Sequence, residues 1–154
     1  MAVAPQANLG VDLALERVDE RALSIYRLRE TAARRVEGGR GVTLRDFALA
    51  EGRDNLGQAL AARLLTPRGE IAALGHAAYG SRLHEVIGQP NTPTTRNLAK
   101  LFVIEALKQE RRVEAIASVE VTPHPANRFL ILVAIEVKPV GSEAVLALAF
   151  GLEL

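Results

Sequence analysis

The pattern of apolar and polar residues changes its period in the second half of the chain. Between Arg96 and Gln109, apolar residues recur every three or four positions and cover a wide arc, which predicts a helix buried at the centre of the domain. Between Val113 and Val121, valine and alanine alternate with mainly polar residues. Alternation with a period of two predicts a strand that has one polar face.

Two further runs, at residues 129–137 and 145–150, are apolar on both faces apart from Glu136. Short connections with proline and glycine separate the three runs, so we expect an antiparallel sheet of three to four strands packed on the central helix. The predicted fold class is α+β. A sheet this small cannot cover both of its faces with its own helices, so the N-terminal segment or another subunit is expected to cover the second face.

Residues from Asp12 to Glu37 are predicted to form one charged amphipathic helix, because apolar residues there fall on a spacing of three and four that Arg29 interrupts. The apolar stripe is narrow and rich in alanine, so two alternatives stay open. The helix packs on its own domain, or it pairs with a helix of a partner. Glycines within residues 38–41 then end it. The chain is therefore divided into an N-terminal helical extension, 1–45, and a domain, 46–154.

The start of the domain is predicted to combine a short strand with two helices. Residues 43–50 resemble a strand, and Asp54 is a candidate N-cap for a helix at 55–65 whose leucines recur every four positions. The sequence TPRG at 66–69 predicts a turn. Ser81 is a candidate cap for a short helix that follows.

Composition narrows the classes of function. The chain has 154 residues, an apolar fraction of 49% and no cysteine, so it suits one domain with an aliphatic core and without disulfides or thiolate metal sites. Its formal net charge is +1 and its arginines are interleaved with acids, so nucleic acid is not an expected partner. The sequence shows neither a signal peptide nor an apolar run of about 20 residues, so we expect synthesis in the cytoplasm and no membrane contact.

Patterns for catalysis and metal binding are weak. His76, His84 and His124 lack the spacing of metal ligands. The glycines at 38–41 lack the lysine of a phosphate-binding loop, and the residues around Ser81 do not follow the GxSxG pattern of a nucleophile. Acidic residues are plentiful, but no signal selects a pair for glycoside hydrolysis. No catalytic residue, metal or cofactor is therefore predicted.

Three charged residues, Glu110, Arg111 and Arg112, stand where the central helix gives way to the first strand. Glu110 lies four residues after Ala106 and seven after Val103, so the helical period places its carboxylate on the apolar side. Such a carboxylate needs a cation beside it, because a buried unpaired charge is strongly destabilising. We favour an ion pair within the chain over a pair with an arginine of another chain. A charged side chain in an apolar setting more often belongs to an ion pair that stabilises its own fold than to a functional contact.

Five stretches in a fixed order resemble the small lysozyme-like wedge protein of contractile phage-tail baseplates. That family also occurs in type VI secretion baseplates and in extracellular contractile injection particles. The resemblance covers about residues 46–154, and it implies a structural subunit rather than an enzyme. The stretches are DNLGQALAARLLTPRGE, YGSRLHEVIGQP, VIEALKQERRVEAI, FLILVAIEV and FGLEL.

The family carries a Glu-Pro-Arg motif at the end of its central helix. Glu110 and Arg112 match the motif, whereas Arg111 replaces the proline. Proline would end the helix rigidly, so Arg111 gives up that rigidity and adds a cation. The resemblance implies that Glu110 and Arg112 help to hold the wedge assembly together, next to a helical bundle of neighbouring wedge proteins.

The resemblance also implies partners and a location. Other baseplate wedge proteins and sheath subunits are the expected partners, with six copies of the chain around the tail tube. Sheath strands are expected to dock on the sheet by β-augmentation. The protein is expected in the cytoplasm during assembly and then in a phage-like or extracellular contractile particle. Two rival hypotheses are a peptidoglycan-cleaving, lysozyme-type hydrolase and a generic dimerisation module.

Overall fold

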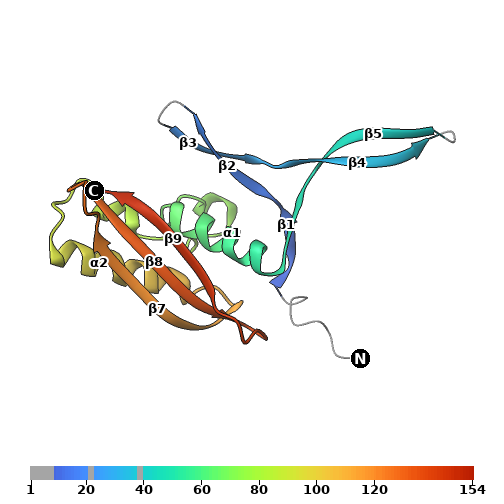
Figure 1. Ribbon diagram of the computed structural model, residues 1–154. Helices are drawn as coiled ribbons and strands as arrows, with labels where there is room; N and C mark the ends of the chain where they lie inside the picture. The colour runs from blue at the N-terminus through green and yellow to red at the C-terminus, as the bar shows by residue number, and fades with distance from the viewer. Residues whose placement is uncertain (1–8, 21–22, 38–39) are drawn as a thin grey trace.

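The computed structural model describes residues 9–20, 23–37 and 40–154. Two α-helices and a three-stranded antiparallel sheet form the body of the molecule, and three two-stranded ribbons precede them in the chain (Figure 1). The antiparallel C-terminal sheet packed on a central helix, as predicted from the sequence, is confirmed.

The predicted helix from Asp12 to Glu37 is wrong, because the described residues of this segment form strands. Each ribbon is an antiparallel pair: β1 with β6, β2 with β3, and β4 with β5. The described part of the N-terminal extension therefore forms strands where a helix was predicted, although the boundary at residue 46 stays a prediction. The strands are β1 (Val11–Leu13), β2 (Leu15–Glu20), β3 (Leu23–Leu28), β4 (Glu30–Glu37), β5 (Arg40–Phe47) and β6 (Leu49–Glu51).

The three ribbons meet at a junction formed by Ala14, Arg29 and Ala48. Their backbones form a closed triangle of hydrogen bonds: the Ala14 N–H donates to the Ala48 carbonyl (2.7 Å), the Ala48 N–H to that of Arg29 (2.7 Å), and the Arg29 N–H to that of Ala14 (2.8 Å). Arg29 is the residue that interrupts the helical stripe. From this junction the β2–β3 and β4–β5 ribbons extend outside the body of the molecule (Figure 1).

The narrow apolar stripe explains why this segment is not a helix. Most of the stability of a helix in a protein comes from packing of its apolar face, and a stripe diluted by alanine offers little to pack. The same residues pair well as strands, since Leu15 lies opposite Leu28 and Val18 opposite Ile25 in the register of β2 and β3. Pairing between strands therefore decided the outcome, although residues three apart lie on opposite faces of a strand.

The body of the molecule begins with α1 (Gly52–Leu65). Its buried leucines Leu56, Leu60 and Leu64 are those that the four-residue spacing predicts. The prediction that Asp54 caps it is wrong: the N-cap position is Glu51, and Asp54 lies in the first turn. There its negative charge still interacts favourably with the positive end of the helix dipole.

The central helix is α2 (Pro93–Leu107). The side chain of Thr92 caps it by accepting a hydrogen bond of 3.2 Å from the Thr95 N–H, and Pro93 takes a position where its missing N–H costs nothing. Between α1 and α2 lie two short 3-10 helices, η2 (Ala72–Leu74) and η3 (Leu83–Val86). The prediction that Ser81 caps this helix is wrong, because the N-cap position of η3 is Arg82; the Ser81 hydroxyl, one position earlier, accepts a hydrogen bond of 3.3 Å from the Leu83 N–H.

Residues 66–69 lie directly beside residues 79–81 and are hydrogen-bonded to them. Pro67 and Ser81 form a parallel bridge, in which the Ser81 N–H donates to the Thr66 carbonyl (2.8 Å). Gly80 has a φ of 104°, and a Cβ there would lie 2.6 Å from the Thr66 carbonyl oxygen. Only glycine suits this position, because both the backbone angle and the space exclude a side chain. Two of the stretches that carry the family resemblance are thus in direct contact.

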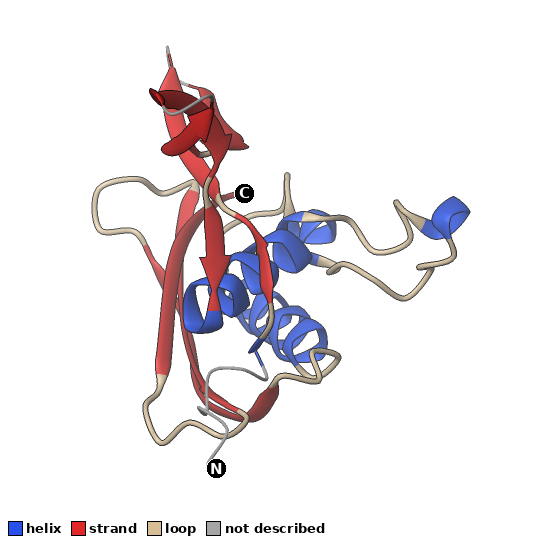
Figure 2. Ribbon diagram, turned by 90° about the vertical axis from the view of Figure 1, so that its right-hand side faces the viewer, coloured by secondary structure: helices blue, strands red, loops and turns tan. Residues whose placement is uncertain are grey.

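The sheet consists of β7 (Val113–Pro123), β8 (Leu130–Pro139) and β9 (Leu146–Glu153), in the order β7-β8-β9. Both helices lie on one of its faces, and the described residues leave the other face uncovered (Figure 2). The uncovered face is mixed: Leu132 and Ala134 on β8 lie beside Ala147 and Ala149 on β9, and the register places Glu120, Thr122 and Glu136 on the same face. The described part of the N-terminal segment does not cover this face, and covering by another subunit stays a prediction.

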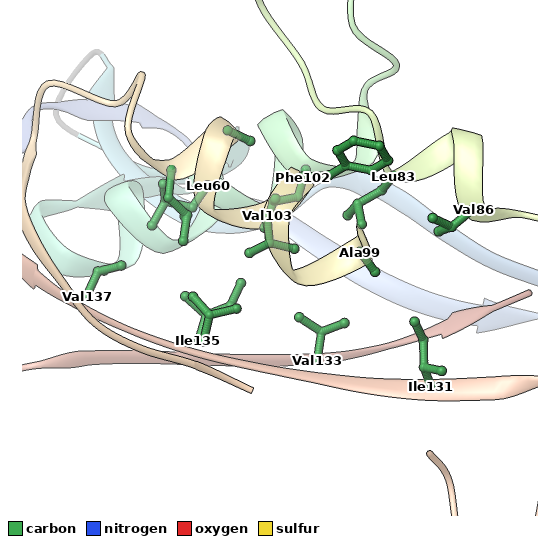
Figure 3. Close-up of a cluster of buried hydrophobic side chains, with 14 of the residues drawn as sticks. Leu60, Leu83, Val86, Ala99, Phe102, Val103, Ile131, Val133, Ile135 and Val137 are labelled. Carbon is green, nitrogen blue, oxygen red and sulfur yellow. The ribbon is translucent and has the colours of Figure 1, made fainter. Parts of the chain in front are cut away.

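The core lies between the sheet and the helices. Alternate residues of β8, from Ile131 to Val137, point at Ala99, Phe102 and Val103 on α2 and at Leu60 on α1 (Figure 3). Leu9, which precedes the first ribbon, is fully buried in the same cluster. The segment before residue 46 therefore contributes to the core of the domain through Leu9.

Candidate functional site

The turn between α2 and β7 holds the three charged residues that the sequence singles out. The helix ends at Leu107, and its last carbonyl accepts a hydrogen bond of 3.1 Å from the Glu110 N–H. The Glu110 carbonyl then accepts from the Val113 N–H (3.1 Å), and the Arg112 carbonyl from the Val140 N–H (2.9 Å). The turn is thus well ordered by backbone hydrogen bonds, although Arg111 stands where the family has proline.

Glu110 and Arg112 form the predicted ion pair within the chain. The Arg112 guanidinium binds both carboxylate oxygens, with Nε 2.8 Å from Oε1 and Nη2 3.2 Å from Oε2. The Arg112 backbone N–H also donates to Oε1 (3.2 Å). The Glu110 side chain is only 10% exposed, as its helical phase predicts. A planar fork with two parallel hydrogen bonds is the strongest arrangement for such a pair.

A second arginine, Arg63 on α1, approaches the same carboxylate. Its Nη2 atom lies 3.6 Å from Glu110 Oε2, and its side chain is 13% exposed. Its guanidinium also stacks on the ring of Tyr79, 4.5 Å from the ring centroid. The buried Nε atom of Arg63 has no hydrogen-bond partner among the described residues. Two cations therefore share one buried carboxylate.

The two arginines determine the charge state of Glu110. Burial by itself raises the pKa of this carboxyl, because it penalises the charged form. The hydrogen bonds from the side chain and backbone of Arg112, together with the charges of Arg112 and Arg63, outweigh burial and hold the pKa below its ordinary value. The hydrogen bond to Glu110 in turn raises the pKa of Arg112, so the pair is charged near neutral pH.

Arg112 also connects the turn to the start of the chain. Its Nη1 atom donates a hydrogen bond of 3.1 Å to the backbone carbonyl of Leu9. The buried side-chain amide of Asn55 donates to the same carbonyl (2.9 Å). The Glu110–Arg112 pair is thus part of a network that joins α1, the α2–β7 turn and the segment before β1.

Arg111 behaves differently from its neighbours. Its side chain is exposed, and within the described ranges it makes no ion pair or hydrogen bond to another side chain. Together with Arg63 and Arg68 it lines an open cleft beside the turn. The three predicted site residues therefore divide into an internal pair and one cation that faces outward.

Arg63 and Leu9 are parts of this network that were not predicted from the sequence. A signal for Arg63 was available, because it lies seven residues after Leu56 and three after Leu60, in the apolar phase of α1. Arg63 thus corresponds to Glu110, because each is a charged residue in the apolar phase of its own helix, Arg63 in α1 and Glu110 just after α2. Leu9 gave no such signal, since nothing in the local pattern indicates which carbonyl a distant arginine will reach.

The remaining candidates show no arrangement for chemistry. His124 orders the connection between β7 and β8, where its Nδ1 atom accepts from the N–H groups of Ala126 and Asn127. His76 and His84 are exposed. In the described part of the chain, histidine, aspartate and glutamate do not gather into a group that could hold a metal ion. Neither described helix is long and apolar enough to cross a membrane.

Comparison with known proteins gives a distant match. No protein-family model and no curated protein matches the chain. Among solved structures, the fold is similar to a crystal structure from Geobacter sulfurreducens of a protein provisionally named as a tail lysozyme. The match has 26% sequence identity and a TM-score of 0.56, and it covers 65% of this chain and 88% of the other. This similarity supports a phage tail-related protein.

Proposed function

We propose that the chain is a structural baseplate wedge subunit of a contractile injection system or phage tail-like particle. In this role it joins neighbouring wedge proteins and docks the first ring of the contractile sheath. The observation that carries the proposal is the fold: helices cover one face of a three-stranded sheet, the other face is exposed, and 65% of the chain resembles a protein provisionally named as a tail lysozyme. The motif stretches along residues 46–154 point to the same family.

The sheet supplies the surface for the sheath. β9 pairs with β8 alone among the described strands, so its other edge offers free backbone N–H and carbonyl groups. A strand from a sheath subunit can add to this edge, with main-chain hydrogen bonds providing affinity and the adjacent side chains providing register. An exposed edge beside apolar residues such as Leu132 is a hazard for aggregation in a free monomer. In an obligate assembly it becomes an interface.

The turn that carries Glu110, Arg111 and Arg112 supplies the contact with other wedge proteins. The internal ion pair holds the turn rigid, and Arg111 presents a charge to the neighbour. Six copies around the tail tube, one for each wedge, would repeat the same contact in a closed ring. The chain would then lie in the cytoplasm during assembly and in the contractile particle afterwards.

A structural role is favoured over hydrolysis because two of the described carboxyls, Glu85 and Glu110, have a pKa shifted in the direction opposite to that of a general acid. A lysozyme-type general acid needs a carboxyl whose pKa is raised. The pKa of Glu85 is instead lowered, chiefly by a hydrogen bond from Arg82, and that of Glu110 is lowered as well. Peptidoglycan cleavage by the pure protein, abolished by replacing a single acid, would overturn the structural role.

The experiment compares particles assembled with variants of the sheet. In a strain that produces the particles, the double variant Ala147→Lys, Ala149→Lys places two cations on the exposed face of β9, beside the docking edge. The matched control, Thr122→Lys, alters the same face at the opposite edge, on β7. Circular dichroism checks that both proteins fold.

We expect the β9 variant to yield baseplates without sheaths in electron micrographs, whereas the control yields sheathed particles at the wild-type level. Normal sheaths with the β9 variant would refute docking on this strand. Absence of the chain from purified particles by mass spectrometry would refute the wedge role as a whole.

A further inference from the structure

An open cleft of about 670 Å³ lies beside the α2–β7 turn. Arg63 comes from α1, Arg68 from the turn after it, and Arg111 from the α2–β7 turn. His76, Tyr79 and Gln109 complete the polar lining, and the remaining positions are glycine and alanine. Every residue of this lining that carries a formal charge at neutral pH is an arginine. A cleft lined by one sign of charge concentrates the electrostatic potential inside it and attracts ions of the opposite sign.

The carboxylates that balance two of these arginines lie outside the lining. Arg68 pairs with Glu105 on α2, and Arg63 pairs with Glu110. Arg111 has no such partner among the described side chains, so the three arginines carry one more charge than the two carboxylates. The Nε atom of Arg63 also lacks an acceptor within the described residues. The cleft therefore has positive charge, on the exposed Arg111, that no described carboxylate balances.

The residues that line the cleft suit a carboxylate. The ring of Tyr79 holds the Arg63 guanidinium in place by stacking, and the exposed small residues Gly75, Ala77 and Ala78 allow another chain to approach closely. Arginine binds carboxylates through two parallel hydrogen bonds, which gives orientation as well as affinity. A segment with two or more acidic side chains could place one carboxylate on Arg111 and another deeper in the cleft.

We propose that this cleft binds the carboxylate side chains of an acidic segment on a partner protein. The identity of that partner as a neighbouring subunit of the baseplate rests on the proposed function, whereas the binding itself does not. A protein segment is favoured over nucleic acid because binding of nucleic acid requires a track of cations along the phosphates. Here the cations are gathered in one cleft and the formal net charge of the chain is only +1.

The test titrates the purified full-length protein with a blocked tetraglutamate peptide. Nuclear magnetic resonance measures the binding. We expect amide shifts that cluster at Tyr79 and Arg111, and an affinity that falls as salt is added. A tetraglutamine peptide of the same length should not bind. Oligothymidylate at the same salt concentration reports whether phosphates are preferred.

Arg111→Gln is the informative variant, because this exposed side chain makes no contact that folding requires. It should weaken tetraglutamate binding roughly 3- to 5-fold, and Arg68→Gln combined with Arg111→Gln should weaken it at least roughly tenfold. The matched control is Arg128→Gln, which removes an exposed arginine from the connection between β7 and β8. Its affinity should equal that of the wild type.

Equal effects of Arg111→Gln and Arg128→Gln would overturn the proposal, as would equal binding of the two peptides. Tighter binding of oligothymidylate than of tetraglutamate would indicate that the partner is a nucleic acid, and it would overturn the proposal too. These failures are distinguishable from failure of the wedge role. If the chain binds tetraglutamate in the cleft but is absent from purified particles, the proposed binding by the cleft stands and the wedge role is refuted.

Discussion

The guanidinium of Arg112 donates a hydrogen bond of 3.1 Å to the backbone carbonyl of Leu9, 103 positions earlier in the sequence. The same guanidinium pairs with both carboxylate oxygens of Glu110. One side chain thus holds the α2–β7 turn and fixes the start of the described chain against it. The arginine of the predicted motif is therefore important for stability as well as for any contact with a partner.

Replacing Arg112 by lysine should destabilise the protein, because a single ammonium group cannot serve Glu110 and Leu9 in the same fork geometry. We expect a loss of about 1–2 kcal/mol in the free energy of unfolding, measured by urea denaturation. Amide hydrogen exchange in β1 should also become faster, since the anchor of Leu9 is weakened. Arg111→Lys is the control and should stay within about 0.5 kcal/mol of the wild type. Equal stability of the two variants would contradict the network.

The stability that Glu110 provides should depend on pH in a defined direction. Its pKa is lowered in the folded protein from an ordinary value of 4.5, so the folded state favours the charged carboxylate. The contribution is complete above about pH 4.5 and is lost as the pH falls through the lower folded-state pKa. At pH 7 we expect Glu110→Gln to cost about 2 kcal/mol.

Urea denaturation of both proteins between pH 7 and pH 3 provides the measurement. The difference between wild type and Glu110→Gln should shrink below about pH 4.5, because protonation removes the charge that the arginines stabilise. Glu114→Gln is the control, since Glu114 is exposed and pairs with Lys138 at the surface. A difference that stays constant down to pH 3 would show that the charge of Glu110 is not what stabilises the fold.

Gly80 should tolerate alanine much less well than Gly88, although both have a positive φ. Gly88 has a φ of 83° with no atom within 4 Å of an added Cβ, so Gly88→Ala carries only the backbone strain, about 1 kcal/mol. At Gly80 the new Cβ would also lie 2.6 Å from the Thr66 carbonyl oxygen. Relief of that contact must separate the bridged segments, so we expect a total cost of at least about 3 kcal/mol. Thermal denaturation of the two variants makes the comparison.

Leu9→Ala should destabilise the domain even though residue 9 precedes its predicted boundary. The side chain is fully buried against the core, and truncation of a buried leucine costs about 2–5 kcal/mol. Val11→Ala is the control, because Val11 is 59% exposed and its truncation should cost less than about 0.5 kcal/mol. Chemical denaturation measures both. An effect of Leu9→Ala as small as that of Val11→Ala would show that this segment is not part of the folding unit.

The elements with broad or strictly alternating apolar patterns were predictable from the sequence. The wide apolar arc after Arg96 is compatible with one arrangement, a buried helix. The alternation after Val113 is also compatible with one arrangement, a strand with one polar face. The phase of Glu110 relative to Ala106 likewise places its carboxylate inside by the helical period alone. These are local relationships, in which the geometry of one element decides which side chains share a face.

The structure of the N-terminal segment could not be predicted from its local pattern, for a physical reason. A stripe of leucine, valine and alanine at a spacing of three and four is too narrow to stabilise a helix by packing, and the same residues pair across antiparallel strands. The choice depends on hydrogen bonds at the junction of Ala14, Arg29 and Ala48, which lie far apart in the sequence. Local periodicity carries no information about such partners.

By itself, therefore, the sequence determined the two helices of the body, the three-stranded sheet and the need of Glu110 for a cation. Only the tertiary structure decided that Arg112 and Arg63 both meet that need, that Arg112 also holds Leu9, and that Arg111 is left in an arginine-lined cleft. These outcomes depend on which elements pack together, and the energy of an ion pair or a hydrogen bond depends on distances that folding alone establishes.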